Sequence, residues 1–178
     1  METPDLTSSR FWSTSESLVL ANPRDPIALS EAEIMQPWIG TQAELIAHLL
    51  FRTSGSTGKG KWVALSKSAL LASARAVNDF LNVTSADRWL LTLPAFHVGG
   101  MGIAARAYLA RCKMVNDNKK WDAARCHQLC VTENITLTSL VPALLLDLVR
   151  LKLPAPESLR ALLVGGGRLE DSVYQKAI

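Results

Sequence analysis

The nine residues from Thr53 to Lys61 have the composition of a phosphate-binding loop. They read Thr-Ser-Gly-Ser-Thr-Gly-Lys-Gly-Lys, and an apolar run from Ala47 to Phe51 comes just before them. Glycines allow backbone N–H groups to turn towards an anion, hydroxyl groups add further donors, and a lysine supplies a positive charge for phosphate. A loop of this composition after a strand indicates a site for the phosphates of a nucleotide.

Two kinds of phosphate loop fit this stretch. Gly55 to Gly60 followed by Lys61 matches the Walker A spacing, G-x-x-x-x-G-K. However, Trp62 stands where that motif needs Ser or Thr for Mg²⁺, and residues 62–65 predict a short strand where the motif needs a helix. The sequence therefore favours a hairpin loop between two strands. A Walker-type module, which would hydrolyse ATP without any acid, is the weaker alternative.

Three further features, two polar side chains and a glycine run, could contribute to a site. His97 comes just before Gly99 and Gly100, so its ring can face a cleft. Arg106 lies on the next predicted helix among small apolar residues, where an arginine either reaches water or pairs with a buried anion. The third feature is a run of three glycines after another apolar strand, where the missing Cβ atoms allow a ligand to approach the backbone: Gly165, Gly166 and Gly167.

The elements that must position these residues alternate between strand and helix. Strands are expected over 48–51, 62–65, 88–93, 112–115, 135–141 and 159–164, and helices over 67–81, 99–110, 121–133, 142–151 and 170–178. Upstream, residues 11–16 predict the start of a capped helix and residues 22–26 a turn. This alternation predicts an α/β fold with a mostly parallel sheet flanked by helices, whose ligands bind at the carboxyl ends of the strands.

Composition excludes several classes of protein. The chain has 178 residues, 48% of them hydrophobic and 20% charged, as expected for a globular protein with a proper core. A net charge of +3 without any basic run gives no reason to expect a nucleic-acid partner. The sequence shows no signal peptide and no apolar stretch that could span a bilayer, so no membrane partner and a cytoplasmic location are expected.

Three cysteines raise the question of a metal site. Cys126 and Cys130 are one helical turn apart, and His127 lies between them. No second pair of ligands accompanies them, and a structural metal site needs about four. Together with Cys112 they are expected to be free and mostly buried thiols, and no metal ligand is assigned.

The phosphate loop resembles that of the adenylate-forming (acyl-CoA synthetase) superfamily, which reads Thr-Ser-Gly-(Ser/Thr)-Thr-Gly-x-Pro-Lys. Gly60 stands where that family usually has Pro. The resemblance implies that the loop binds the phosphates of ATP and the glycine turn packs against adenine and the acyl group. The nucleotide-binding residues are then Thr53, Ser54, Gly55, Ser56, Thr57, Gly58 and Lys61, with Gly165, Gly166 and Gly167 in the turn.

The segment from Phe96 to Arg106 is similar to the corresponding run in o-succinylbenzoate–CoA ligases, whose substrate is a dicarboxylate. The resemblance implies an acid-binding pocket lined by His97, Gly99, Gly100 and Arg106, in which Arg106 holds the carboxylate that is not activated and His97 assists it. The implied activity is that of an acid–CoA ligase of menaquinone biosynthesis, with ATP, Mg²⁺ and CoA. A CoA ligase for another aromatic or short acyl acid is the alternative within the family.

The resemblance covers roughly residues 49–178. Residues 1–44 are expected to form an N-terminal segment, and residues 45–178 an incomplete core of the large nucleotide-binding domain. The family's Tyr-Gly-x-Thr-Glu segment, ribose-binding Asp, hinge and catalytic Lys have no counterpart in these residues, so no catalytic residue is assigned. The chain is therefore expected to be an N-terminal fragment or a truncated product that is inactive alone and whose exposed core surface drives association between fragments. A catalytically silent fragment with an interaction role is a further alternative.

Overall fold

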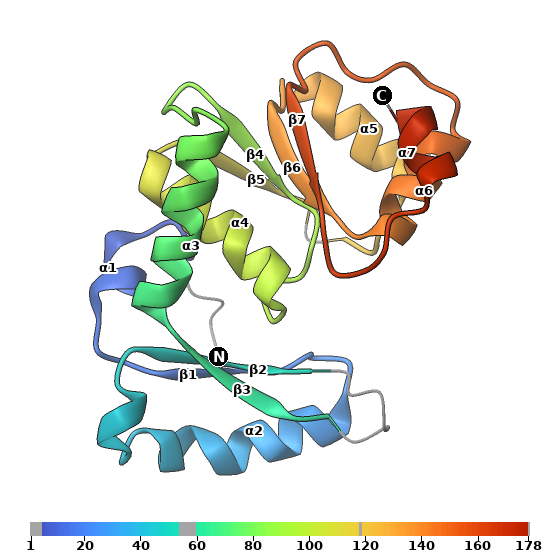
Figure 1. Cartoon of the computed structure of the whole chain (residues 1–178). Coiled ribbons are helices and arrows are strands. Elements are labelled where there is room, and N and C mark those ends of the chain that lie inside the picture. The colour runs from blue at the N-terminus through green and yellow to red at the C-terminus, as the bar shows by residue number, and fades with distance from the viewer. Residues whose placement is uncertain (1–4, 54–59, 118, 178) are drawn as a thin grey trace.

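The computed structural model describes residues 5–53, 60–117 and 119–177, and it divides the strands between two sheets (Figure 1). Sheet A consists of β1 (Leu18–Leu20), β2 (His48–Arg52) and β3 (Trp62–Ser66). Its central strand, β2, is parallel to β1 and antiparallel to β3. Sheet B is parallel throughout, in the order β5-β4-β6-β7; its strands are β4 (Arg88–Leu91), β5 (Lys113–Asn116), β6 (Leu137–Leu140) and β7 (Ala161–Val164).

Helices and sheets form alternating layers. Helix α2 covers the outer face of sheet A, α3 and α4 lie between the two sheets, and α5 and α6 cover the far face of sheet B (Figure 1). The bounds of the helices are α1 (Ser9–Ser13), α2 (Pro26–Ile39), a short 3-10 turn η1 (Ala43–Leu45), α3 (Lys67–Phe80), α4 (Val98–Ala110), α5 (Ala123–Thr132), α6 (Pro142–Arg150) and α7 (Asp171–Ala177).

Helix α4 contributes to the hydrophobic core on both of its sides. Met101 and Ala104 are fully buried in a cluster that contains Phe51 of β2. Ile103, which points to the opposite side of the helix, is fully buried in a second cluster with Trp89 of β4. A helix that is apolar on all sides belongs in the interior, and α4 accordingly joins the cores of the two sheets.

The far face of sheet B has its own core. Cys126 and Cys130 of α5 pack with Leu90 and Ile135. These two thiols and that of Cys112 are buried and form no disulfide, which agrees with the prediction of free, mostly buried cysteines.

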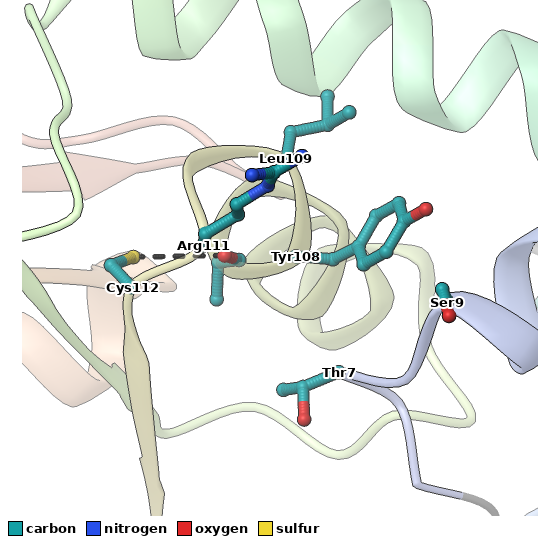
Figure 2. A pocket seen from close by; sticks show the side chains of 7 residues that line it. Thr7, Ser9, Tyr108, Leu109, Arg111 and Cys112 are labelled. Atoms are coloured by element: carbon teal, nitrogen blue, oxygen red, sulfur yellow. Dashed lines mark hydrogen bonds between the residues drawn. The ribbon is translucent and has the colours of Figure 1, made fainter.

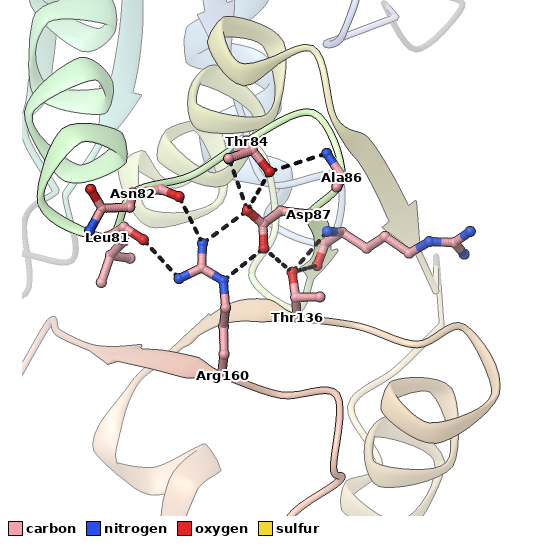
Figure 3. A network of polar contacts seen from close by, with 8 residues as sticks. Leu81, Asn82, Thr84, Ala86, Asp87, Thr136 and Arg160 are labelled. Carbon is pink, nitrogen blue, oxygen red and sulfur yellow. Dashed lines mark hydrogen bonds and ion pairs between the residues drawn. The ribbon is translucent and has the colours of Figure 1, made fainter.

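A polar cluster holds together the amino ends of the sheet B strands (Figure 3). Asp87, just before β4, pairs with Arg160, just before β7, and accepts a hydrogen bond of 2.7 Å from the hydroxyl of Thr136, just before β6. This cluster lies at the end of the sheet opposite to the predicted ligand site, so its role is structural.

The predicted α/β fold class is confirmed, but the strands do not form one sheet. The strands predicted at 48–51 and 62–65 pair with each other as an antiparallel hairpin, which β1 then extends. The short apolar run of β1, Leu-Val-Leu, was not predicted as a strand. The remaining predicted strands and helices occur with ends shifted by at most two residues, which is usual at element ends.

Two predictions upstream of residue 45 need correction. The predicted helix start at residues 11–16 is wrong, because α1 begins at Ser9 and ends at Ser13. Its N-cap is Ser8, whose hydroxyl accepts a hydrogen bond of 3.2 Å from the Phe11 amide. Helix α2 was missed because it buries only Ala28 and Ile39, which leaves little apolar periodicity in its sequence. The turn predicted at residues 22–26 is present and leads into α2.

In the described part of the chain, no helix combines the length and the apolar character that a membrane-spanning helix requires.

Candidate functional site

The stem of the predicted phosphate loop is a well-formed hairpin. β2 and β3 pair in antiparallel register from His48 with Ser66 to Arg52 with Trp62. One further pair extends the ladder, since the Thr53 amide donates to the Lys61 carbonyl at 2.8 Å. Both side chains of that last pair are exposed. The other predicted phosphate ligands lie outside the described residues; these are Ser54, Gly55, Ser56, Thr57 and Gly58.

This hairpin excludes the Walker alternative. A Walker A loop passes from a strand directly into the helix whose amino end receives the phosphates. Here the residues after Lys61 form β3, and α3 begins only at Lys67, capped by the Ser66 hydroxyl. The strand–loop–strand arrangement predicted from the sequence is therefore confirmed.

The second predicted feature begins where β4 ends. The chain turns through Pro94 and enters α4 at His97, whose amide donates to the Pro94 carbonyl at 3.0 Å. Gly100 is buried against this turn, because a Cβ atom on it would lie 2.3 Å from the Pro94 oxygen and 2.4 Å from the Leu93 oxygen. The next glycine upstream, Gly99, faces the Leu93 side chain. These glycines allow α4 to start immediately beside the end of β4.

His97 follows this turn as the N-cap residue of α4. Its ring stacks at an angle on the ring of Phe96, with 4.6 Å between the centroids. Loss of hydration beside these protein atoms lowers the pKa of His97 from its ordinary value. The imidazole is therefore mainly neutral near pH 7 and can donate or accept one hydrogen bond.

Arg106 is the most unusual charged residue of the region. Its Nη1 donates to the hydroxyl of Ser139, near the end of β6, at 3.0 Å, and its guanidinium lies 5.5 Å from the centre of the Trp89 ring. Its Nε is buried and has no hydrogen-bond partner, and no carboxylate of the described residues forms an ion pair with it. Burial lowers the pKa of Arg106, although an arginine keeps its charge.

The glycine turn lies next to the end of β6. The Gly165 amide donates to the Leu140 carbonyl at 3.1 Å, and a Cβ atom on Gly166 would lie 3.2 Å from the Val141 side chain. Gly166 has a φ of +78°, a left-handed conformation that favours glycine. All three glycines are exposed, so their backbone is accessible to a ligand.

The structure thus brings two of the three predicted features together. Arg106 and the glycine turn both meet the carboxyl end of β6, through Ser139 and Leu140 respectively. His97 begins the same helix as Arg106, but nine residues separate them, which is about 13 Å along the helix axis. Among the described contacts none joins His97 to Arg106, so direct assistance between them is not seen.

The sequence analysis missed two residues of this region. Ser139 and Trp89 are the partners of Arg106, and both are buried. Ser139 carried a signal, because it is one of two polar residues in the otherwise apolar strand β6, and a buried hydroxyl needs a partner. Trp89 carried none, since a tryptophan in a buried strand is ordinary core.

Two hollows in the described surface lie elsewhere. The larger, of about 500 Å³, is lined by Thr7, Ser9, Tyr108, Arg111 and Cys112, among others, and lies between the segment before α1 and the end of α4 (Figure 2). The other, of about 420 Å³, lies beside Gln36 of α2. Neither contains a residue predicted for the site.

Comparison with known proteins identifies the family. Residues 14–178 match the family described as AMP-binding enzyme. A 2-succinylbenzoate–CoA ligase of Bacillus cereus (strain ATCC 10987 / NRS 248) is 36% identical over 142 residues, which is 77% of this chain and 28% of that protein. An indoleacetate–CoA ligase of Aromatoleum aromaticum is 40% identical over 107 residues, 60% of this chain and 20% of that protein.

A solved structure agrees with these relatives. The o-succinylbenzoate coenzyme A synthetase of Bacillus subtilis, in complex with ATP and magnesium, superposes with a TM-score of 0.66 and 28% identity. The superposition covers 72% of this chain and 27% of the synthetase. The chain spans less than a third of the length of these relatives. The match over residues 14–178 shows that the chain belongs to the AMP-binding enzyme family.

Proposed function

We propose that this chain is the phosphate- and acid-binding part of an ATP-dependent acid–CoA ligase. ATP and a carboxylate give an acyl-adenylate and pyrophosphate, and the CoA thiol then displaces AMP to give the acyl-CoA. The preferred acid is 2-succinylbenzoate, the substrate named for several relatives. The proposed pathway is menaquinone synthesis, as the sequence resemblance implies. The division into an N-terminal segment (residues 1–44) and a domain core (residues 45–178), a cytoplasmic location and self-association all remain predictions from the sequence.

The observation that carries the choice of acid is the state of Arg106. Arg106 is half-buried and lacks a carboxylate partner among the described residues, and its buried Nε–H has no acceptor. Burying an uncompensated charge costs several kcal/mol, so a site that keeps one normally has an anion to bind. A dicarboxylate supplies that anion when one of its carboxylates is activated and the other lies beside Arg106.

The chain's own residues divide the remaining tasks. Lys61 and the hydroxyls and amides of the loop hold the phosphates of ATP and stabilise negative charge as pyrophosphate leaves. Mg²⁺ enters with the nucleotide and supplies charge neutralisation there. The exposed backbone of Gly165–Gly167 is accessible to adenine. His97 and the close-packed Gly99 and Gly100 border the acid at the start of α4.

The test is pyrophosphate release by the polypeptide at its encoded length, with 2-succinylbenzoate and with indoleacetate as acids. The proposal predicts release with 2-succinylbenzoate, and Arg106→Met should raise the KM for that acid about 100-fold, the cost of leaving one buried charge unpaired. The KM for indoleacetate, which has a single carboxylate, should change little. Arg111→Met, which removes an exposed arginine at the end of the same helix, is the matched control.

Other outcomes have distinct meanings. Turnover of indoleacetate in preference to 2-succinylbenzoate would favour the alternative, a ligase for another aromatic acid, as the relative from Aromatoleum suggests. Equal losses for both acids in Arg106→Met would remove Arg106 from recognition of the second carboxylate. No acid-dependent pyrophosphate release with any carboxylate would contradict the ligase proposal itself.

A further inference from the structure

Arg52 is a cation next to the predicted phosphate loop, but its charge is paired with carboxylates of another segment. It is the last residue of β2, one position before Thr53. Its Nε donates to Glu31 at 2.9 Å and its Nη1 to Asp25 at 3.1 Å, and only 23% of its side chain is exposed. Two carboxylates of α2 and its cap therefore neutralise this guanidinium, which leaves no free charge for a phosphate.

The same carboxylate holds both strands of the hairpin. Glu31 Oε2, which accepts from Arg52, also accepts a hydrogen bond of 2.9 Å from the indole nitrogen of Trp62. Trp62 is the partner of Arg52 across the hairpin, so a single oxygen from α2 ties the last ladder pair of β2 and β3 together. Hydrogen bonds in which a partner is ionised are about twice as strong as neutral ones.

Asp25 performs two tasks with its two oxygens. Its Oδ1 accepts from the amides of Ile27 and Ala28, which caps the first turn of α2. Its Oδ2 is left for Arg52. The amino end of α2 is therefore ordered by the same side chain that holds the hairpin, and the position of one fixes the position of the other.

Gly60 shows how closely the guanidinium crosses the hairpin. A Cβ atom on Gly60 would lie 2.8 Å from Cζ and 2.9 Å from Nε of Arg52, and 2.8 Å from the Thr53 carbonyl oxygen. The guanidinium thus occupies the space that a side chain at position 60 would fill. Position 60 therefore favours glycine, because the Arg52 side chain passes over it towards α2.

We propose that Arg52 is a positioning residue for the phosphate hairpin: together with Asp25 and Glu31 it forms a clamp, here called the α2 clamp, that fixes the stem from which Thr53 and Lys61 face a nucleoside triphosphate. The identity of that ligand rests on the proposed function. Arg52 acts through the stem and does not itself touch the phosphates. Helix α2, which carries none of the predicted ligands, then sets the affinity of the site for the triphosphate.

The first test is hydrogen exchange of the Thr53 amide, which closes the last rung of the hairpin, measured by NMR on the full chain. Arg52→Met should speed this exchange at least tenfold, as expected for the loss of its two charge-assisted hydrogen bonds, and should shift the Trp62 indole N–H resonance. Arg88→Met, which removes an arginine from β4, should leave both unchanged. Unchanged Thr53 exchange in Arg52→Met would overturn the proposal.

The second test measures the coupling between Arg52 and Gly60. Gly60→Ala should increase Thr53 exchange strongly in the natural chain and less in an Arg52→Ala background, since two of the three obstructing atoms are then absent. Equal effects in the two backgrounds would show that the guanidinium does not determine the need for glycine at position 60.

The third test separates this proposal from the proposed function. In the polypeptide at its encoded length, Arg52→Met should raise the KM for ATP at least tenfold, the same loss as in the exchange test, and leave the KM for the acid unchanged. If the natural polypeptide consumes no ATP with any acid, the proposed function fails, and the exchange experiments still decide whether the α2 clamp exists. If ATP is consumed with an unchanged KM, the positioning role fails.

Discussion

The carboxylate of Asp87 and the guanidinium of Arg160 form two hydrogen bonds side by side, from Nε at 2.8 Å and from Nη2 at 2.9 Å. The two residues precede β4 and β7, which are not neighbours in sheet B, and Thr136 before the intervening strand donates to the same carboxylate (Figure 3). The hydrogen bonds from Arg160 hold the pKa of Asp87 well below its ordinary value. This pair therefore locks the amino ends of three strands in register.

Asp87→Asn should lower the free energy of unfolding by roughly 3 kcal/mol at pH 7, because it leaves the guanidinium of Arg160 without its anion. The measurement is urea unfolding followed by circular dichroism. Glu133→Gln, which disrupts an exposed pair with Lys113, is the control and should cost clearly less. Equal losses of stability in the two variants would show that the burial of Asp87 does not strengthen its pairing with Arg160.

The same pair predicts a pH dependence with a definite sign. The folded-state pKa of Asp87 is lowered, so its contribution to stability is fully present above its unfolded-state pKa and is lost as the pH falls through that value towards the folded-state pKa. The stability difference between the natural chain and Asp87→Asn should be constant from pH 7 to about pH 5 and should shrink below about pH 4. A difference that stays constant down to pH 3 would contradict the assigned cause.

Gly100→Ala should be strongly destabilising, by about 3 kcal/mol or more, because the added methyl group meets two backbone oxygens that cannot move aside. Gly102→Ala, two residues later on the same helix, is the matched control. Its nearest neighbour would be the end of the Arg106 side chain at 3.4 Å, and alanine is the better helix former, so no loss of stability is expected. Thermal unfolding of both variants gives the comparison, and similar melting temperatures would refute it.

Lys67 is expected to anchor the N-terminal segment. This lysine is only 2% exposed, and its ammonium donates to the Phe11 carbonyl at 2.8 Å and to the carbonyl and hydroxyl of Thr14. Lys67→Met should cost about 1–3 kcal/mol because buried acceptors lose their donor. Limited proteolysis should show faster cleavage near α1, and an unchanged cleavage pattern would mean that the aromatic residues of α1 suffice to hold it.

Ser139→Ala tests whether the hydroxyl orients Arg106. Loss of this single hydrogen bond should raise the KM for 2-succinylbenzoate about fivefold and leave the KM for ATP unchanged. Steady-state kinetics on the polypeptide at its encoded length provides both values. A parallel rise in both constants would indicate general damage to sheet B instead of a specific effect on Arg106.

Much of sheet B could be predicted from the sequence, for a physical reason. Its strands are short apolar runs bounded by turn residues, and its helices carry clear periodicity, as in α5 with Cys126 and Cys130 buried one turn apart. Local sequence is sufficient there because the apolar residues of the local pattern are the ones that the fold buries. The phosphate hairpin was predicted as well, since Trp62 to Leu65 has strand composition.

The division into two sheets could not be predicted in the same way. It depends on β1, three residues that become a strand only by pairing with β2, and on α2, whose apolar residues Ile34 and Trp38 remain 73% and 52% exposed. Partners distant in the chain determine both elements. The contact of Arg106 with Ser139, 33 positions later, is of the same kind. The polar residue in β6 indicates that a partner is needed, but nothing in the local sequence identifies Arg106 as that partner.

Helix α4 lies between the two sheets, and alanines contribute to its packing on both sides: Ala104 and Ala105 in the first cluster and Ala107 in the second. The phosphate hairpin belongs to the sheet on one side of this helix and the β6 edge to the sheet on the other. A larger side chain at Ala104 or Ala105 would therefore push the two halves of the site apart as a unit. In the proposed ligase, the spacing between the triphosphate and the acid depends in part on these alanines.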